Sequence, residues 1–586
     1  MSNAFDKASL VMLPHAYEEG KVYSLKPTDR SGDFTFSRGT DTATRVGEDG
    51  YIKKEYANLL TQSNSFDTSP WIISGFHYNN LIGNQTGYDG SSDAWLLDKA
   101  TIDNQYLRHQ SFLTDSVYTA SIYAKANTAE SVMIYVPGGY ATFRLTQGGA
   151  VVSAGSNPID TKMEDVGNGW FRCSVTGTGS QSNYYIQPKD ATGAYTIGSI
   201  YIQDAQVNNG LVAYPYLETT TAPVYGGLTD DMPRLDYSDG ATCPSLLLEP
   251  SRTNDIAHSE YFEGGTLSNA TLSLSGTSPE NINNAYALTE TTVNAEHYWI
   301  SEPMTTATNN NLVSTIFVKP NGRTKIRLWN YYLSNQFARV DVDLTNNTTS
   351  NGASGNVTFV SANVTNAPNG WKRVEIQSIK TASTYAYSIR VNLLDDSGND
   401  VYTGDATKGV YIYGGQMEQN ATYPTSYIPT YGSSQTRAYD NSTLLNIDTN
   451  IVDITGDFTF YLDNTGSLMK GTELYYYFIE LYWDAITSIR YYSTSNGSWY
   501  YKPSNTYYGF NNSVGKQVIK YQNGVFYHFL NGTKSPSTGT MAVTNSLSKI
   551  QFFANTTGKA GYLNIKQALL FDSALSDDQC IALTTL

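Results

Sequence analysis

Charged and sulfur-containing residues are scarce in this chain of 586 residues. Only 15% of the residues are Asp, Glu, Lys or Arg. The three cysteines, Cys173, Cys243 and Cys580, lie far apart and lack metal-ligand spacing, which excludes a disulfide framework and a cysteine-based zinc site. Cys173 falls on the apolar side of the alternating stretch 171–176, so we expect a small core residue rather than a reactive thiol.

Catalytic motifs are missing as well. The sequence has no HExxH spacing, no GxSxG elbow and no P-loop. Nucleophilic hydrolysis, zinc chemistry and nucleotide binding therefore have no motif to support them, and we expect no enzyme, no catalytic residue, no metal and no cofactor. The isolated histidines are His15, His77, His109, His258, His297 and His528.

Long apolar runs are absent, and acidic residues outnumber basic ones. No stretch approaches the ~20 apolar residues needed to span a bilayer. The first residues lack the basic start and apolar core of a secretion signal. A formal net charge of -16 would repel nucleic acid and anionic membranes, so we expect neither as a partner.

Tyrosine, glycine and small polar residues are abundant instead. The chain has 47 Tyr and 48 Gly, types that suit half-buried strands and the turns between them. A chain of this length also exceeds what one hydrophobic core supports. The composition therefore predicts an all-β protein of several domains.

An internal repeat with a period of about 200 residues indicates duplicated whole domains. Four segments recur in the same order, and Arg172 recurs as Arg373 after the second of them. We predict two copies of one β module. The matched segments are Ser121-Ile122-Tyr123-Ala124-Lys125 with Thr315-Ile316-Phe317-Val318-Lys319, Asn168-Gly169-Trp170 with Asn369-Gly370-Trp371, Ile200-Tyr201-Ile202 and Gln206 with Val410-Tyr411-Ile412 and Gln416, and Tyr214-Pro215 with Tyr423-Pro424.

Each copy is expected to consist of short strands. Residues 118–125 alternate between apolar and polar side chains, the period of a strand covered on one side. The Asn-Gly pairs before Trp170 and Trp371 supply the positive φ of a tight turn, and both tryptophans are assigned a structural role. Short strands separated by turn clusters predict sandwiches of jelly-roll type.

Residues 440–586 are expected to form a third β module. The stretch 475–483 is apolar or aromatic on both faces, which suits a strand covered on both sides or one that lines an aromatic groove. Residues 568–579 predict a strand that leads into a short helix with Ser576 as N-cap. Earlier in the chain, Leu246 to Leu248 form the plainest candidate for a fully buried strand.

Two stretches outside the repeats carry the most specific resemblance. GDFTFSRGTDTATRVGEDGYI at 32–52 and PRLDYSDGATCPSLLLEPSRTN at 233–254 resemble a recurrent element of tailed-phage head-fibre, spike and tail-fibre proteins. In such relatives the two halves stand close together, whereas here the first module lies between them. The resemblance covers about seventy residues and implies a phage structural protein, without distinguishing head from tail.

The modules carry resemblances of their own. The NGW strand and the IYIxxxQ…YP ending are similar to carbohydrate-binding modules of jelly-roll type, and Ala574 to Gln579 (ALSDxQ) resembles the end of laminin-G-like or concanavalin A-like sandwiches. The expected fold is all-β and multidomain, with two repeated jelly-roll sandwiches and a C-terminal concanavalin A-like sandwich. The expected units are a connecting β unit (1–60 with 226–255), sandwiches at 61–225 and 256–439, and the C-terminal sandwich at 440–586.

Acidic residues offer two weaker candidates. A glycosidase needs two carboxylates held about 5–10 Å apart; Glu480 and Asp484 are available, but no motif singles them out, and surface carboxylates are the favoured interpretation. Residues 395–400 (Asp-Asp-Ser-Gly-Asn-Asp) suit a hairpin turn better than a structural Ca²⁺ site, because the distal Glu of an EF-hand is missing.

Aromatic clusters next to turn residues are the candidate glycan sites, because sugar rings stack on flat side chains. The alternative, that these rings belong to the core or to subunit contacts, is favoured at each cluster. The candidates are Trp329, Tyr331, Tyr332, Trp499, Tyr501, Tyr507 and Tyr508.

Together these features predict a structural virion protein of a tailed bacteriophage, assembled in the host cytoplasm and displayed on the virion surface. The expected partners are other virion proteins (capsid, portal or tail), a host-surface glycan, and further copies of the chain, with a trimer favoured. Many copies on one particle would make weak glycan contacts useful. Two alternatives stay open: a glycan depolymerase of a tail spike, and a bacterial surface adhesin, which the missing export signal disfavours.

Overall fold

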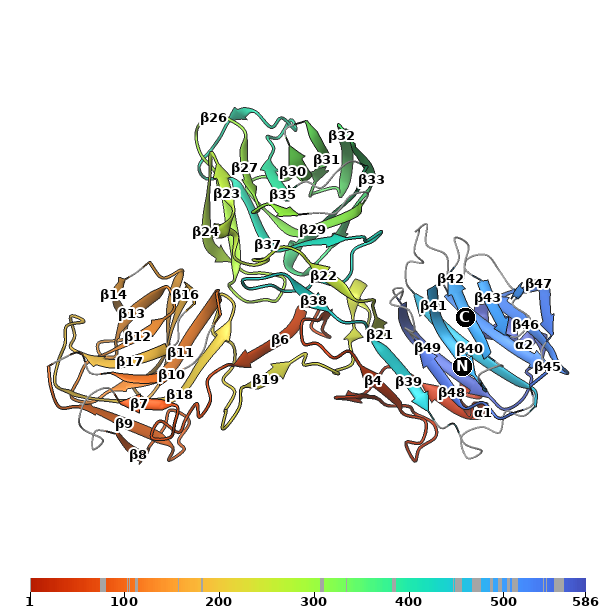
Figure 1. Cartoon of the computed structure of the whole chain (residues 1–586), viewed down its shortest axis with the longest axis horizontal. Coiled ribbons are helices and arrows are strands. Elements are labelled where there is room, and N and C mark those ends of the chain that lie inside the picture. The colour runs from red at the N-terminus through yellow and green to blue at the C-terminus, as the bar shows by residue number, and fades with distance from the viewer. Residues whose placement is uncertain are drawn as a thin grey trace.

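Strands dominate the structure, which forms three β-sandwiches around a small central region (Figure 1). This confirms the prediction of an all-β, multidomain protein. The computed structural model describes residues 2–585 except 74–80, 103, 105, 111–113, 156, 181–182, 306–309, 334, 382–385, 446, 448–455, 466–475, 485–487, 494–497, 503–505, 509–514, 541, 544 and 553–562. Neither helix among these residues, α1 (Ser2–Lys7) or α2 (Asp577–Thr585), is long and apolar enough to cross a membrane.

Sandwich 1 lies at the left of Figure 1 and has two antiparallel sheets. The first consists of β14 (Ala150–Gly155), β13 (Gly139–Arg144), β12 (Ser131–Val136), β17 (Asn183–Lys189), β10 (Leu107–Gln110) and β7 (Trp71–Ile73), in that order. The second consists of β15 (Asp160–Gly167), β16 (Trp170–Gly179), β11 (Ser116–Ala126), β18 (Gly198–Asn209), β9 (Ala94–Lys99) and β8 (Leu81–Gln85). Apolar side chains from both sheets fill the space between them.

Sandwich 2 lies at the top of Figure 1. Its first sheet consists of β32 (Thr348–Ser354), β31 (Gln336–Asp343), β30 (Lys325–Leu333), β35 (Ala386–Leu393), β27 (His297–Ile300) and β23 (Thr266–Ser268), with β28 (Met304–Thr305) also beside β35. Its second sheet consists of β33 (Val357–Asn366), β34 (Lys372–Lys380), β29 (Asn310–Asn321), β37 (Gly409–Gln419), β25 (Ala285–Glu290) and β24 (Ala270–Gly276). A two-stranded ribbon joins β26 (Asn294–Ala295) to β36 (Tyr402–Thr403).

The two sandwiches share one strand order, so the predicted duplication is confirmed. Each strand of sandwich 1 has a counterpart at the same place in sandwich 2, from β7 and β23 to β18 and β37. Successive strands mostly alternate between the two sheets, as in a jelly roll. A β-bulge even recurs at matching places, between Ser121 and Tyr123 in β11 and between Thr315 and Phe317 in β29.

The paired Asn-Gly turns and tryptophans behave as predicted. Asn168 and Asn369 have φ of 54° and 56°, and the glycine after each is also in the left-handed region. Trp371 is fully buried and its indole N–H donates to the Thr277 carbonyl at 3.0 Å; Trp170 is buried as well. Both tryptophans are therefore structural.

One predicted match in the repeat is wrong by two residues. The Arg172 guanidinium donates to the carbonyl of Tyr214, whereas Arg373 donates to that of Thr425, at 2.7 Å. Thr425 therefore takes the place of Tyr214, and pairing Tyr214-Pro215 with Tyr423-Pro424 is a local coincidence. The buried guanidinium fixes the backbone carbonyl that it reaches, whatever side chain that residue carries.

A buried asparagine marks the start of each copy. The Asn58 side chain donates to the carbonyls of Ala205 and Leu217 at 3.0 and 2.8 Å. Asn254 donates to the corresponding carbonyls of Gly415 and Ile428 at 3.1 and 2.9 Å. Each amide thereby joins the first residues of its sandwich to the last, which satisfies its own buried polar atoms.

Sandwich 3 lies at the right of Figure 1 and recruits strands from distant parts of the chain. One sheet consists of β20 (Leu235–Asp236), β21 (Ser245–Leu248), β49 (Leu563–Phe571), β40 (Phe458–Thr465), β45 (Gly515–Gln522), β46 (Val525–Leu530) and β47 (Thr533–Thr540), with β1 (Leu10–Met12) also on β49. The other consists of β2 (Tyr17–Glu18), β3 (Lys21–Val22), β4 (Phe34–Ser37), β39 (Asn441–Leu445), β48 (Lys549–Phe552), β41 (Tyr476–Tyr482), β42 (Ser488–Ser493), β43 (Ser498–Lys502) and β44 (Thr506–Tyr508).

Segments expected to form a separate connecting unit thus complete this sandwich. Leu10 pairs with Leu570, Leu246 pairs with Ile565, and the Phe34 ring stacks on Phe552 at 5.2 Å. All four residues of β21 are buried, as predicted for the leucine run. In the sheet β21 lies between β20 and β49, so a strand from the end of the chain pairs with one side of the leucine run.

The C-terminal helix α2 begins where the sequence predicts a capped helix. The Ser576 hydroxyl accepts the Gln579 backbone N–H at 3.2 Å, and the Gln579 side chain accepts the Ser576 N–H at 2.9 Å. This reciprocal pair is a capping box at the start of α2. Ser576 is therefore confirmed as the N-cap.

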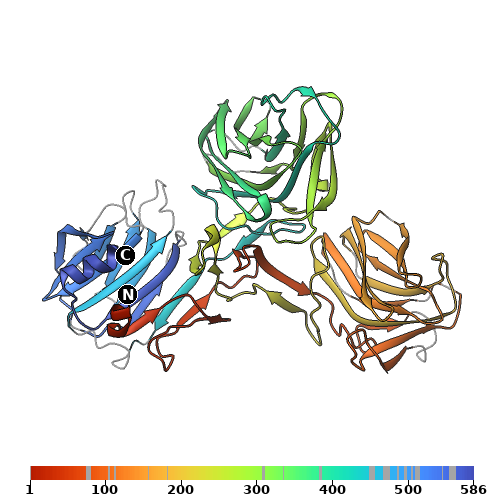
Figure 2. The same cartoon turned by 180° about the vertical axis from the view of Figure 1, so that it is seen from behind.

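A central hub joins the three sandwiches and is visible from both sides (Figures 1 and 2). Its sheets are β5 (Thr44–Val46), β6 (Ile52–Asn58) and β19 (Val224–Gly227), and the pair β22 (Arg252–Asn254) and β38 (Gln435–Arg437). Five charged side chains, all at most 1% exposed, form a connected ion network in it: Arg38, Arg234, Glu249, Arg437 and Asp440.

The network joins segments that are distant in sequence. The Arg234 guanidinium contacts both Asp440 and Glu249, the latter at 2.6 Å, and Arg437 contacts Glu249 at 2.8 Å. Burial opposes ionisation, but Arg437 and Arg234 hold the pKa of Glu249 at about 2. Arg38 reaches Asp440 at 3.5 Å, and burial lowers its pKa to about 10.

Replacing Arg234 by methionine should destabilise the protein by about 3–5 kcal/mol, because Glu249 and Asp440 would lose a buried partner. The matched control is Lys53→Met, which breaks the exposed ion pair with Asp49 and should cost less than about 1 kcal/mol. Urea unfolding followed by tryptophan fluorescence measures both. Equal effects would show that the hub network contributes no more than a surface pair.

Candidate functional site

Two of the predicted aromatic residues lie on the outer face of sandwich 2. Ile326 and Leu328 of β30 point into the core, so the alternate residues Trp329 and Tyr331 lie on the opposite face. Neighbouring strands add Tyr298 and Arg390 to this surface. We call these four residues, with Asn392, the sandwich 2 face.

Hydrogen bonds fix the geometry of the sandwich 2 face. The Trp329 indole N–H donates to the Asn392 side-chain oxygen at 3.0 Å, and Arg390 Nε donates to the same oxygen at 2.8 Å. The Arg390 guanidinium lies 3.7 Å from the centre of the Tyr298 ring and pairs with Glu296 at 2.8 Å. This stacking is a cation–π interaction in a partly buried setting.

Trp329 forms the floor of this face and is not an open stacking platform. It is 7% exposed, and the guanidinium groups of Arg327, Arg339 and Arg390 lie over its ring at 5.6, 5.6 and 5.3 Å. Tyr331 is half-buried. A ligand on this face would therefore meet tyrosine rings and the half-buried Arg339. The indole is buried, as are Arg327 and Arg390.

Tyr332 takes no part in the face. Its side chain is 5% exposed, packs in the core of sandwich 2, and lies 6.1 Å from the Tyr387 ring. The strand period of two places it opposite Tyr331 and so removes it from contact with any external sugar. Burial raises its pKa to about 12.

Sandwich 1 presents a related surface that the sequence reasoning missed. The Tyr185 ring lies 4.6 Å from Tyr106 and 5.2 Å from Tyr135, in edge-to-face contacts, and all three tyrosines are half-buried. The core pair Ile134–Ile186 of sandwich 1 corresponds to Leu328–Val391 of sandwich 2. With the two copies aligned in this way, Tyr106, Tyr135 and Tyr185 occupy the positions of Tyr298, Trp329 and Arg390. We call these three tyrosines the sandwich 1 face. The alternation of buried and half-buried side chains along β12 and β17 is the sequence pattern that could have identified this face.

The remaining aromatic candidates belong to sandwich 3. Trp499 and Tyr501 occupy β43, and Tyr507 and Tyr508 occupy β44, two paired strands at one edge of the sheet. Their side chains lie outside those that the structure describes. In β41, which β42 separates from β43, the side chains of Ile479 and Leu481 are buried in the core.

The acidic candidates have structural partners. Glu480 pairs with Arg490 at 2.6 Å and with Lys549 at 3.1 Å, and Asp484 accepts a hydrogen bond from Asn545. Asp395 accepts the backbone N–H groups of Ser397 and Asn399 at 2.9 and 2.7 Å, which closes the turn before β36. No group of three His, Cys, Asp or Glu side chains among the described residues is arranged to hold a metal ion.

A carboxyl pair that the sequence did not reveal lies at the hub. Burial, together with the charge of Asp41 and a hydrogen bond to it, raises the pKa of Glu55 to about 9, and Asp230 adds to the effect. Glu55 therefore keeps its proton at neutral pH. The pair lines a cavity of about 620 Å³ together with Tyr225, whose pKa burial also raises.

The sign of the pH dependence follows from the raised pKa of Glu55. Between the unfolded value of 4.5 and about 9 the folded chain keeps a proton that the unfolded chain loses, so stability falls as pH rises. Glu55→Gln removes this dependence. Its free energy of unfolding relative to the native chain should therefore rise from pH 5 to pH 8 in urea titrations, whereas the exposed Glu48→Gln should show no trend. A flat difference for Glu55→Gln would contradict the raised pKa of Glu55.

Comparison with known proteins adds little to this geometry. No protein-family model matches the chain, and no curated protein matches it. Among solved structures, a Trypanosoma rangeli sialidase in complex with the inhibitor DANA aligns with 88% of this chain and 98% of its own, at 10% identity and a TM-score of 0.20. Likeness at that TM-score supports no conclusion about fold or function.

Proposed function

We propose that this chain is a structural protein of a tailed-phage particle, a fibre, spike or decoration protein that displays glycan-binding β-sandwiches and cleaves no bonds. The observation that carries the proposal is the arrangement of three sandwiches as separate arms around one hub, in which a buried ion network joins the segments on either side of sandwich 2. Such an arrangement suits display, because each arm keeps exposed faces. In this proposal the third arm is of laminin-G or concanavalin A type.

The resemblance to phage fibre and spike proteins falls on the residues that build the hub. Arg38 belongs to the stretch at 32–52, and Arg234 and Glu249 belong to the stretch at 233–254. Both stretches also supply strands to sandwich 3. We infer that this element is an assembly unit of virion proteins, onto which sandwiches are added.

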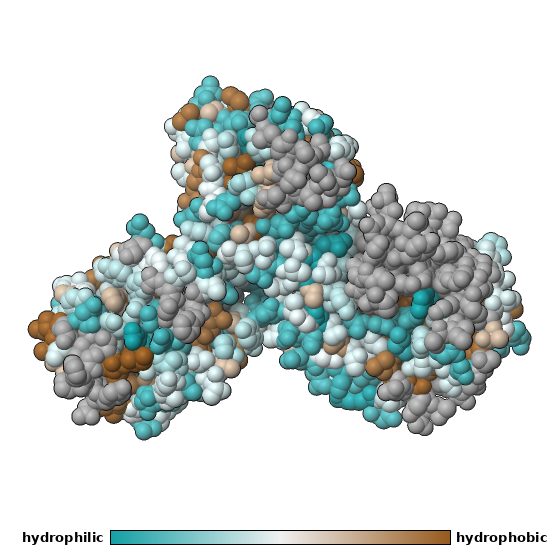
Figure 3. Space-filling model, in the orientation of Figure 1, coloured by the Kyte–Doolittle hydropathy of each residue, from teal (hydrophilic) through white to brown (hydrophobic). Residues whose placement is uncertain are grey.

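The two sheet faces support glycan recognition. Tyrosine rings offer apolar surface to the C–H groups of a sugar, and the half-buried Arg339 beside them offers hydrogen bonds to its hydroxyls. Figure 3 shows only small, separate hydrophobic patches on one side of the molecule, which suits polar ligands better than a large apolar partner. Several copies of the chain on one particle, with a trimer favoured, would multiply weak contacts.

One specific observation favours the depolymerase alternative: the carboxyl groups of Asp41 and Glu55 lie beside tyrosines in a cavity. The enzyme hypothesis predicts that the chain releases reducing sugar from host polysaccharide and that Glu55→Gln abolishes the release. We expect no release from either protein. Release by the native chain alone would replace the binding proposal with the enzymatic one.

Tyr331→Ala and Tyr298→Ala should each weaken glycan binding by the full chain about three- to tenfold, because each removes a ring from the sandwich 2 face. A glycan array followed by calorimetry on the best binder measures the change. The control is Tyr439→Ala, an exposed tyrosine in the segment between sandwiches 2 and 3. Unchanged binding in both face variants would remove this face from the proposal.

Location on a particle is tested directly. A cryo-EM map of purified phage that encodes this chain should contain three-lobed density that fits the sandwiches and hub, at a fixed copy number. Mass spectrometry of the same particles should detect the chain. Particles that lack both the density and the chain would refute the virion assignment.

A further inference from the structure

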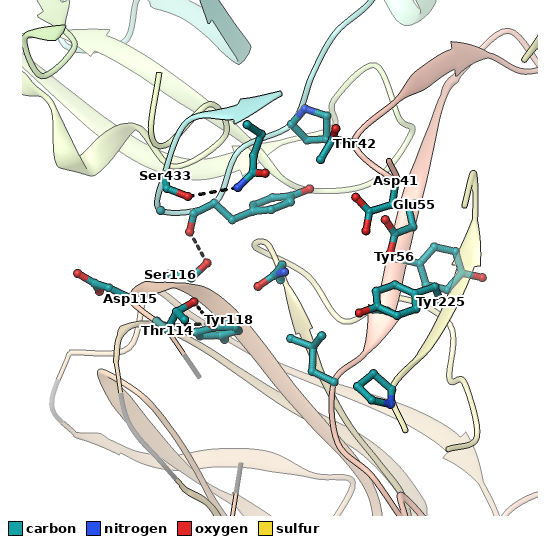
Figure 4. Close-up of a pocket in the computed structure, with 18 of the residues that line it drawn as sticks. Asp41, Thr42, Glu55, Tyr56, Thr114, Asp115, Ser116, Tyr118, Tyr225 and Ser433 are labelled. Atoms are coloured by element: carbon teal, nitrogen blue, oxygen red, sulfur yellow. Dashed lines mark hydrogen bonds between the residues drawn. The ribbon is translucent and has the colours of Figure 1, made fainter. Parts of the chain in front are cut away.

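A cavity of about 620 Å³ lies between the hub, sandwich 1 and the segment that leaves sandwich 2 (Figure 4). Its volume lies within the range of about 300–1,000 Å³ that small-molecule sites occupy. Its lining includes the acidic residues Asp41, Glu55 and Asp115 and the tyrosines Tyr56, Tyr225 and Tyr431. This cavity is separate from both sheet faces.

The hub forms one wall of the cavity. Asp41 and Glu55 lie together, with the rings of Tyr56 and Tyr225 beside them (Figure 4). Strand pairing of β6 with β19 fixes these positions, because Ala57 lies opposite Tyr225. Tyr225 is 49% exposed, so an aromatic ring is open to a ligand directly next to the carboxyl pair.

Sandwich 1 and the segment 429–435 form the facing wall. Figure 4 shows Thr114, Asp115 and Tyr118 across from the carboxyl pair. The Val117 backbone N–H donates to the Tyr431 carbonyl at 2.9 Å, and the Ser116 hydroxyl donates to the same carbonyl. The rim of sandwich 1 is therefore tied to the segment that closes sandwich 2, and the cavity is built from structured backbone.

The charge of the cavity restricts what can bind there. Its described lining includes the carboxyl groups of Asp41, Glu55 and Asp115 and contains neither lysine nor arginine. His109 also lines it, but burial lowers the pKa of this imidazole to about 4, so it adds no positive charge at neutral pH. An acidic ligand would meet negative charge without any compensating cation.

We propose that this cavity is a second binding site, for a short saccharide that carries no acidic group. The carboxyl pair offers a donor and an acceptor side by side, which matches neighbouring hydroxyls of a sugar. The Tyr225 ring provides the stacking surface, and Asp41 accepts a hydroxyl or amine beside it. Neutral and amine-bearing sugars share this chemistry, whereas uronic and sialic acids do not.

The inference goes beyond the proposed function, because the site does not use the sheet faces and can be occupied whether or not they bind. It also has a structural consequence. A ligand here would contact the hub, sandwich 1 and the end of sandwich 2 at once, and so would stabilise their relative placement.

Saturation-transfer NMR on the full chain tests the proposal with methyl glycosides of glucose, galactose, mannose, N-acetylglucosamine, glucosamine and glucuronic acid. We expect signal from at least one neutral or amine-bearing glycoside and none from the glucuronide. Tyr225→Ala and Asp41→Ala should reduce that signal about three- to tenfold. Both residues are partly or fully exposed, so these variants should fold.

One control and one comparison variant separate this site from the rest of the molecule. Tyr195→Ala removes another exposed tyrosine (47% exposed) and should leave the signal unchanged, whereas Tyr331→Ala reports on binding at the sandwich 2 face. Signal that survives both cavity variants but falls in Tyr331→Ala would support the face and overturn the cavity. Absence of signal from every glycoside, or equal signal from the glucuronide, would also overturn the proposal.

Discussion

The buried ion network of the hub is the constraint on which the rest of the structure depends. Taking a charged side chain out of water costs several kcal/mol unless a partner is in place. Arg234 meets Glu249 and Asp440 only when residues from both sides of sandwich 2 come together. The segments on both sides of sandwich 2 must therefore be in place for these buried charges to be paired.

A second buried cluster extends this constraint to the sandwiches. Lys54 of the hub contacts Glu260 and Glu280 of sandwich 2 at 2.5 and 2.9 Å, and the Tyr214 hydroxyl at the end of sandwich 1 donates to Glu280 at 3.4 Å. Burial alone would lower the pKa of Lys54, but the two carboxylates raise it, so the ammonium stays charged. Buried ion pairs and hydrogen bonds, as well as apolar contacts, therefore hold sandwiches 1 and 2 against the hub.

Duplication preserved the frame of the jelly roll and changed its surface. Core positions, the bulge and the buried asparagine recur in both copies, because a shift in register would move every apolar side chain to the wrong face. Outer positions are free of that restriction. Tyr135 in one copy corresponds to Trp329 in the other, and Tyr185 corresponds to Arg390. Two copies of one fold can therefore present different ligand chemistry.

Local patterns determined what depends on neighbours in sequence: the all-β class, the duplicated module, the Asn-Gly turns, the buried run at Leu246 to Leu248 and the Ser576 cap. Each rests on backbone period or a short hydrogen-bonded motif. Tertiary structure alone decided that residues 10–37 complete sandwich 3, that Tyr332 faces the core, and that Asp41 meets Glu55. The first outcome depends on packing between segments hundreds of residues apart. The other two depend on which side chains the folded chain turns toward the core or toward each other, which no local pattern of side chains encodes.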